Sequence, residues 1–209
     1  MKTDSDTGRA NQKMRTRVAI IEACREIMRS GAPVTMPEVA RSALVSEATA
    51  YRYFPDLTSL LNAALESMWP SPAEALRPVA HSSDPVERVA FACEFLLRRV
   101  QAFQGGVRAM ISATITRPEL ASARPGIRFG LIDEALAPLG DTLDAAGLAR
   151  LAQLKADLAA VISSEALFSL TDLVGLSADD AIASLVRTAT AVVEAALASG
   201  PAATSSVGP

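Results

Sequence analysis

The side chains best suited to recognition chemistry lie between Thr35 and Phe54, where hydroxyl, aromatic and basic groups follow one another at short spacing. Thr35 and Ser46 are residue types that cap helix N-termini, and apolar positions at helical spacing follow each of them. The spacing predicts two short helices joined by a tight turn, with Arg52 near the end of the second. Such a pair is a helix-turn-helix, whose second helix enters the major groove of DNA.

The first helix of the pair is expected to begin with a capping box. The Thr35 side chain can accept from the backbone N–H of Glu38, and the Glu38 carboxylate can reach back to the N–H of Thr35. Pro37 is tolerated in this first turn because an N–H there has no helical partner. Ser46 is expected to cap the second helix in the same way.

A wider pattern surrounds this element and runs from Arg15 to Leu61. Its members are Ile20-Ile21, Ala23, Gly31, Val34-Thr35, Val39-Ala40, Val45-Ser46, Thr49, Tyr51, Tyr53-Phe54 and Leu60-Leu61. In combination they resemble the N-terminal domain of the TetR family of bacterial transcriptional regulators. The resemblance implies an all-helical homodimer, in which a three-helix N-terminal domain binds operator DNA and a larger C-terminal bundle binds a small effector and dimerises.

Two positions depart from the family pattern. Leu44 stands in the turn where the family usually has glycine, and a residue with a Cβ at positive φ costs about 1 kcal/mol or more. Either this turn takes another shape, or the strain is tolerated. Leu57 stands where the family often places a lysine against a phosphate, so one backbone contact is expected to be missing.

The second helix is expected to present its first turn, Glu47 to Thr49, to the base edges of DNA. Arg52, one turn further, is the best candidate for a base or a phosphate contact, while Glu47 either accepts from a cytosine amino group or lies on a solvated face. By resemblance, Thr35, Thr49, Tyr51 and Tyr53 are phosphate contacts, and Phe54 belongs to the core. The predicted DNA-binding residues are Arg15, Arg17, Thr35, Ser46, Glu47, Ala48, Thr49, Tyr51, Arg52 and Tyr53.

The composition favours helices throughout. Half of the 209 residues are hydrophobic and only 4% are aromatic, and no run alternates apolar and polar residues as a half-buried strand does. The net charge of -3 is unevenly divided. Up to Phe54 there are nine Lys and Arg against six Asp and Glu, and beyond it eleven against seventeen. A basic front is expected if only that part meets a polyanion.

We therefore predict an all-α chain with an N-terminal helix-turn-helix domain and a C-terminal bundle, about nine helices altogether. The predicted divisions are a disordered arm over 1–12, a DNA-binding domain over 13–55, an effector-binding and dimerisation domain over 56–199, and a disordered tail over 200–209. The expected helices cover about 13–30, 56–68, 84–104, 107–116, 125–138, 148–174 and 177–199 besides the helix-turn-helix pair, with an irregular connection over 70–83.

The last two long helices are the predicted dimer interface. Apolar residues lie on every side of the segment 158–170, which indicates burial against more than one partner. The final helix carries a stripe of small residues beside a stripe of larger ones, and small residues let helices approach closely. A two-fold, self-complementary contact between copies is therefore expected. The alternative is a monomeric bundle.

The predicted effector cavity is apolar, as ligand pockets generally are. Its candidate lining residues are Trp69, Phe91, Phe95, Met110 and Phe129, each of which can instead be ordinary core. The aromatic character favours a small hydrophobic effector.

Other classes of function have weaker support. Cys24 and Cys93 are interpreted as buried thiols and His81 as an exposed loop residue, with no metal or cofactor expected. No nucleophile and base are spaced as in an enzyme, and no signal peptide or membrane span is predicted, so a cytoplasmic location is expected. The rival interpretation is a helical ligand-binding or protein-interaction module whose degenerate helix-turn-helix does not bind DNA.

Overall fold

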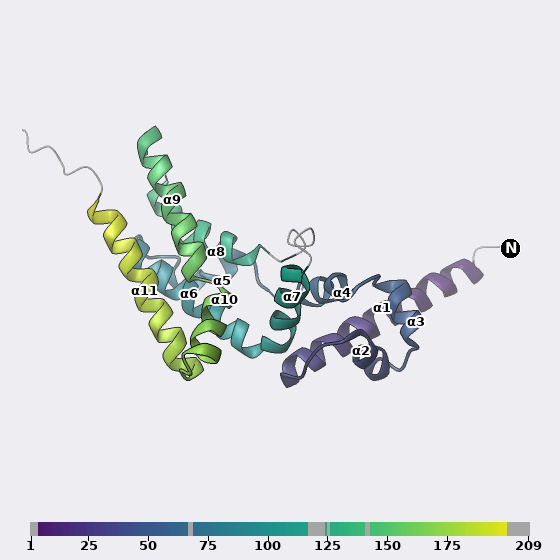
Figure 1. Ribbon diagram of the computed structural model, residues 1–209. Helices are drawn as coiled ribbons and strands as arrows, with labels where there is room; N and C mark the ends of the chain where they lie inside the picture. Colours follow the sequence, from purple (N-terminus) through teal and green to yellow (C-terminus); the bar gives the residue numbers. More distant parts are fainter. Residues whose placement is uncertain (1–3, 67–68, 117–123, 125, 141–142, 200–209) are drawn as a thin grey trace, which may run out of the picture. The chain divides into compact units, whose positions relative to one another are not determined.

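The computed structural model describes residues 4–66, 69–116, 124, 126–140 and 143–199, and the regular structure in these ranges is all helical (Figure 1). The all-α prediction is confirmed. Two compact units form, one from residues 1–69 and 102–125 and the other from 70–101 and 126–209. The predicted boundary at residue 55 differs from this division, because the structure groups two helices that follow it, α4 (Leu57–Glu66) and α7 (Gln104–Thr116), with the first unit.

Helix α1 spans Asp4–Ser30 and is longer than predicted. Residues 4–12, which we expected to be a disordered arm, form its first turns. Residues 1–3 of the predicted arm lie outside the described residues.

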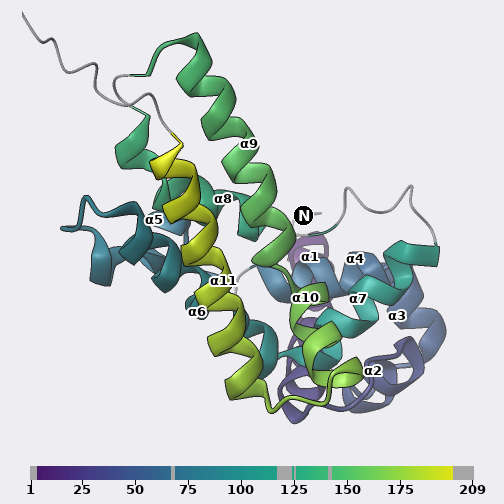
Figure 2. The same ribbon diagram turned by 60° about the vertical axis from the view of Figure 1, so that its left-hand side comes forward.

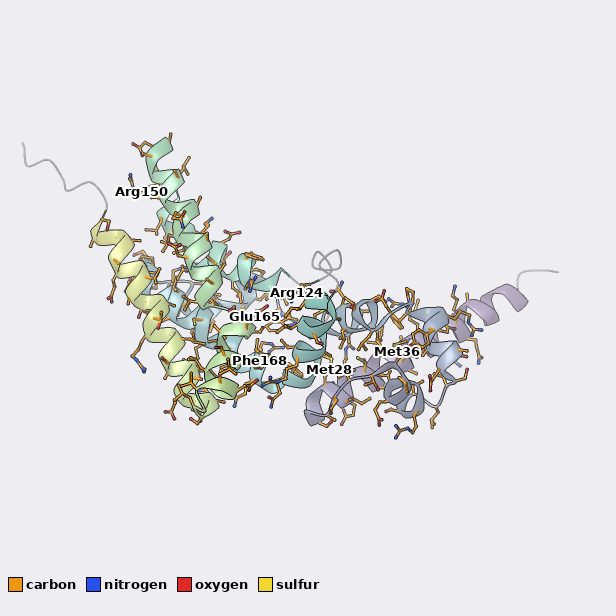
Figure 3. The ribbon with its side chains drawn as sticks, viewed as in Figure 1. Met28, Met36, Arg124, Arg150, Glu165 and Phe168 are labelled. Carbon is orange, nitrogen blue, oxygen red and sulfur yellow. The ribbon has the colours of Figure 1, made fainter. Side chains whose placement is uncertain are left out.

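The first unit is built around the apolar stripe of α1. Ile20, Cys24 and Met28 are fully buried there, as the helical spacing predicts. Helices α2 (Met36–Ser42), α3 (Glu47–Tyr53) and α4 (Leu57–Glu66) contribute the rest of this core. Met28 and Met36 are both among its members (Figure 3). Phe54 is only 3% exposed, which agrees with its interpretation as core.

Helix α4 begins where its cap predicts. The backbone N–H of Ser59 donates to Asp56 Oδ1 at 2.7 Å, which satisfies one of the free N–H groups of the first turn. Leu57 is half-buried and packs against the core of the first unit. Residues 67–68, where we expected the helix to end, lie outside the described residues.

Helix α7 (Gln104–Thr116) also belongs to the first unit and packs against α1 and α4. We expected Gly105 and Gly106 to separate two helices, but both lie inside the first turn of α7. A Cβ on Gly105 would lie 2.5 Å from the Ala32 carbonyl oxygen, and one on Gly106 would lie 2.4 Å from Met28 Cε. The glycines therefore permit a close helix approach, which local sequence patterns do not distinguish from a helix end.

The second unit begins with short helices over the segment 70–83, which we expected to be irregular. Helix α5 covers Pro72–Ala75 and the 3₁₀ turn η1 covers Arg77–Val79. A full capping box starts α5: the Glu74 N–H donates to Ser71 Oγ at 3.3 Å, and the Ser71 N–H donates to Glu74 Oε2 at 2.9 Å. The Ser-Pro-x-Glu sequence indicates this helix start, since serine and glutamate form the capping box and proline is tolerated at the first helical position. The other prolines of the segment favour an irregular connection and make this indication less clear.

Helix α6 (Pro85–Ala102) carries a buried arginine that holds three segments together. Arg88 is 4% exposed. It donates to the backbone carbonyl oxygens of Val79, Ser82, Glu134 and Ala135 at 3.1, 3.4, 2.5 and 3.0 Å. The last two are at the end of α8 (Ile127–Ala135), where carbonyl groups have no helical partner.

The predicted helix over 148–174 is divided in the structure. Helix α9 covers Ala145–Val161, α10 covers Ser164–Phe168 and the π-helical segment η4 covers Ser169–Leu173. The break lies at Ser163, which is extended and accepts from the Ala166 N–H at 3.1 Å. A serine inside an apolar run thus acts as an N-cap, because its side chain competes for backbone N–H groups.

Helix α11 (Ala178–Ala198) begins after the Ser177 cap and packs beside α9 (Figures 1 and 2). Its larger stripe faces the unit: Ile182, Leu185, Ala189 and Val193 are buried. The small-residue stripe is mostly outside, since Thr188, Ala191, Ala195 and Ala198 are exposed. The 3₁₀ turn η3 (Ala137–Leu139) follows α8, and the predicted tail over 200–209 lies outside the described residues.

Candidate nucleic-acid interface

The two caps of the helix-turn-helix are in place. Thr35 Oγ1 accepts from the Glu38 N–H at 3.3 Å, and Ser46 Oγ accepts from the Thr49 N–H at 3.2 Å. The Glu38 carboxylate does not complete the predicted box, because it accepts a hydrogen bond from Arg41 on the next turn. The Ser46 hydroxyl also donates to Thr49 Oγ1 at 3.0 Å, which fixes both hydroxyl groups at the start of α3.

The structure shows which conformation the turn between α2 and α3 adopts with leucine at position 44. Leu44 has a φ of 54°, in the left-handed region that favours glycine. Its N–H donates to the Arg41 carbonyl at 3.1 Å, and the Val45 N–H donates to the Ala40 carbonyl at 2.9 Å. These two bonds define a Schellman motif. The turn therefore keeps the glycine-type shape, and the strain of about 1 kcal/mol is tolerated.

The outer face of α3 is accessible within the first unit. Glu47, Ala48, Tyr51 and Arg52 are exposed, and Thr49 and Tyr53 are half-buried. The other predicted contacts, Arg15, Arg17, Thr35 and Ser46, are also exposed. The structure thus brings the sequence-predicted DNA-binding residues onto α1 and the helix-turn-helix of one unit. Their contacts with DNA stay a prediction.

The described basic side chains of α1, α2 and α3 fall into two sets. Arg25, Arg29 and Arg41 each form an ion pair with a glutamate three residues earlier. For Lys13, Arg15, Arg17 and Arg52, the described side chains include no ion-pair partner. The second set lies on the N-terminal half of α1 and at the end of α3. Among the described side chains of α1, α2 and α3, these cations are available to an external anion.

Two cations of this second set lie over aromatic rings of the recognition helix and its cap. The Arg17 guanidinium carbon is 5.2 Å from the centre of the Phe54 ring, and that of Arg52 is 5.7 Å from the centre of the Tyr53 ring. Such contacts orient a guanidinium without neutralising its charge. The aromatic residues therefore hold the arginines at the surface.

A cleft opens between the N-terminal half of α1 and the end of α3. Its volume is about 430 Å³, and Gln12, Lys13, Arg52 and Tyr53 line it. Lys13 and Gln12 are not among the sequence-predicted DNA-binding residues. The available signal is helical spacing, since Lys13 lies one turn before Arg17 on α1.

The predicted effector residues are divided between the two units. Trp69 and Met110 belong to the first unit, where Met110 is buried core and Trp69 packs against it. Phe91 and Phe95 lie half-buried on α6, with ring centres 6.4 Å apart and an interplanar angle of 19°. Phe129 on α8 is 51% exposed, with the Arg128 guanidinium 4.8 Å from its ring centre. Phe91 and Phe95 thus form a stacked aromatic pair on α6.

The remaining polar candidates give little sign of catalysis. Burial raises the pKa of the Cys24 and Cys93 thiols to about 12, so neither is a thiolate at neutral pH. His81 is exposed. Within the described ranges, no three His, Cys, Asp or Glu side chains gather as a metal site.

Comparison with known proteins places this helix-turn-helix in a class. Residues 20–64 match the family described as bacterial regulatory proteins, tetR family. A TetR transcriptional regulator from Rhodococcus sp. RHA1 is similar in structure, with a TM-score of 0.54 and 23% identity over 86% of this chain and 97% of that one. A TetR-family regulator from Mesorhizobium loti MAFF303099 aligns over 89% and 96% of the two chains, with 18% identity and a TM-score of 0.38. No curated protein matches.

The described residues thus form an all-helical protein with a helix-turn-helix near its N-terminus. More particularly, residues 20–64 match the model of the TetR family and the fold is TetR-like, as the sequence pattern predicts.

Proposed function

We propose that this chain is a ligand-responsive transcriptional regulator that binds a near-palindromic operator as a dimer and is released by a small hydrophobic effector. The observation that carries the proposal is the set of exposed cations without ion-pair partners, grouped on α1 and α3 beside a doubly capped helix-turn-helix. Unpaired cations on one face are the electrostatic footprint of a DNA-binding surface.

The test is DNA binding by the full chain. Duplexes are selected from a random-sequence pool, and their affinity is measured by fluorescence anisotropy together with that of an unselected duplex. We expect selection of a near-palindromic sequence whose half-sites lie about one helical turn apart. A chain that enriches no sequence, and ignores every duplex at low ionic strength, would contradict the proposal.

Dimerisation through α9 and α11 is part of the proposal. Helix α11 has a mean hydropathy of 1.5 over its most apolar window, and 28% of that window is buried in a single chain. By length and composition it is the one helix of the described residues able to cross a membrane. We propose that a second copy of the chain covers the exposed surface of α11. One face of this helix already packs on α9, and the exposed face carries small residues suited to a close helix contact. Sedimentation of the full chain at several concentrations tests this.

The effector is proposed to contact the stacked pair Phe91 and Phe95. Half-buried aromatic side chains offer apolar area to a ligand while remaining reachable. A ligand acts on DNA affinity only if it binds the DNA-free arrangement better than the DNA-bound one. A thermal-shift screen is expected to find stabilising compounds that are apolar; a set of exclusively polar hits would overturn this part of the proposal.

Repression, a cytoplasmic location and the absence of enzymatic activity belong to the same proposal by analogy with the family. A specific observation favours the rival interpretation: Leu57 packs against the core at the start of α4 and offers no charge to a phosphate. In that case the chain would be a ligand-binding or protein-interaction module that does not bind DNA. Salt-dependent duplex binding discriminates between the two, since neutralising phosphates must give a steep salt dependence.

A further inference from the structure

We infer that two charged side chains on the exposed face of α11, Arg187 and Glu194, make this helix select a second copy of the same chain. The inference rests on the proposed dimer and deepens it, because it assigns the residues that choose the partner and set the helix register. Arg187 pairs with Glu194 of the partner subunit across the two-fold axis. Since the axis repeats every contact, two such ion pairs form in each dimer.

Helix α11 presents both charges on the side that faces away from its own unit. Arg187, Ala191 and Glu194 follow one another at intervals of four and three residues, which keeps their side chains on one face of a helix. All three are exposed. Ile182 and Ala189 on the opposite side are buried, and α11 lies beside α9 (Figure 2). The two charges therefore lie where a second chain can reach them.

Neither charge is neutralised within the described part of the chain. Arg187 and Glu194 have no ion-pair partner among the described side chains. Pairing within a helix needs an opposite charge three or four residues away, and at those distances α11 has only alanine, serine, threonine and leucine. Arg98 on α6, by contrast, pairs with Glu94 one turn away and with Asp179. The charges on the exposed face of α11 thus remain available to another chain.

The arrangement of these charges is complementary to itself. Arg187 and Glu194 are about 10 Å apart along the helix axis, with Ala191 near the midpoint. A two-fold axis that passes through this midpoint, perpendicular to the helix, places Arg187 of one copy opposite the partner's Glu194. The small residue at the midpoint allows the two helices to approach closely. A slip of one helical turn would separate both pairs, so the charges specify one register.

The polar groups of this face also indicate what kind of surface covers it. A lipid bilayer disfavours two charged side chains in the middle of a helix face. The hydroxyl groups of Thr188 and Thr190 already donate to the backbone carbonyl oxygens of Ser184 and Arg187, each at 2.9 Å. Burial of these hydroxyls against a partner therefore leaves neither of them without an acceptor. The face fits a protein partner with opposite charges at the same spacing, and the chain itself has that pattern.

The experiment uses two charge reversals in the full chain, Arg187→Glu and Glu194→Arg, each studied alone and in an equimolar mixture. The matched control is Arg77→Glu, which makes the same charge change at an exposed residue of η1, outside α9 and α11. Sedimentation over a range of concentrations measures the homodimers. Native mass spectrometry of chains with tags of different mass measures the heterodimer, and circular dichroism confirms that each variant folds.

We expect each charge reversal to raise the dissociation constant of the homodimer by about a hundredfold, because both ion pairs become contacts between like charges. In the mixture, the two variants should form a heterodimer in excess over either homodimer, since both of its contacts then join opposite charges. A chain that carries both reversals should dimerise as the wild type does. Arg77→Glu should keep the wild-type dissociation constant.

Three outcomes would overturn the inference. Wild-type homodimers in both single variants would remove the role of the two charges while leaving the proposed dimer intact. Weakened homodimers that give no excess of heterodimer on mixing would show that Arg187 and Glu194 do not face each other. A wild-type chain that stays monomeric at every concentration would remove the proposed dimer and the inference together.

Discussion

Two arginines of this chain show opposite uses of the same side chain. Arg88 in the second unit is 4% exposed and donates to four backbone carbonyl groups. Arg52 in the first unit is exposed, lies over a tyrosine ring and has no ion-pair partner among the described side chains. The hydrogen-bond donors of Arg88 are used within the fold, whereas those of Arg52 remain available to a ligand. Which partners a cation has already acquired, rather than its residue type, indicates whether it stabilises the fold or awaits a ligand.

The same contrast divides α1 along its length. At the C-terminal end, Arg25 and Arg29 are paired with glutamates of the preceding turn. At the N-terminal end, Lys13, Arg15 and Arg17 have no such partners among the described side chains. The availability of positive charge therefore changes along a single helix, and the available end is the one beside α3.

The largest effect is expected for Arg88→Met, which tests whether the hydrogen bonds donated by the buried arginine stabilise the fold. The substitution removes the hydrogen bonds that Arg88 donates to four buried or half-buried carbonyl groups, so the free energy of unfolding should fall by about 3 kcal/mol. Urea denaturation measures it. Arg88→Lys should recover only part of the loss, because an ammonium cannot reproduce the planar fork of donors. Full stability in Arg88→Met would show that these bonds contribute little.

Arg52→Ala tests whether the exposed arginine contributes to DNA binding and not to stability. We expect operator affinity to fall by about 1 to 3 kcal/mol while the free energy of unfolding changes by less than about 0.5 kcal/mol. Anisotropy titration and urea denaturation of the same preparation give both values. An unchanged affinity would refute the assignment of Arg52 to the interface.

Leu44→Gly extends the comparison from charge to backbone strain. Leu44 holds a φ of 54° and is 92% exposed, so its side chain gives the fold almost no packing in return. Relief of the strain should raise the free energy of unfolding by about 1 kcal/mol, reduced by the greater chain entropy of glycine. Thermal or urea denaturation measures this, with Leu44→Ala as the control that keeps the strain. A destabilised glycine variant would mean that the side chain is needed for the turn.

The smallest effect is expected for Arg29→Ala. Its ion pair with Glu26 lies at the surface, with 48% and 73% of the two side chains exposed, so its contribution to stability should be below about 0.5 kcal/mol. Duplex affinity should not change either, because this charge is already neutralised. A loss of affinity comparable to that of Arg52→Ala would break the distinction between paired and unpaired cations.

The sequence predicted the parts of the fold that local rules decide. Thr35 and Ser46 cap helices as expected, and the apolar stripe of α1 is buried. The errors come from tertiary packing. Gly105 and Gly106 resemble a helix end but allow α7 to approach α1 closely, and α7 joins the first unit for the same reason.

The candidate site divides in the same way. The residues of the helix-turn-helix could be named from their spacing, because caps and turns lie within a few residues of one another. For Lys13 the sequence offers only its helical spacing to Arg17, because its proximity to Arg52 depends on how α1 passes α3 in space. The prediction of the effector residues rests mainly on their apolar or aromatic side chains, and the structure places Met110 in the core of the first unit.

The most direct test of the central claim, that unpaired cations beside α3 meet DNA, is the salt dependence of duplex binding by the wild-type full chain. The account predicts measurable binding at low ionic strength and a log–log slope of about −0.9 for every phosphate neutralised, amounting to several units for a dimer. Absence of binding, or an affinity that does not change with salt, would contradict it.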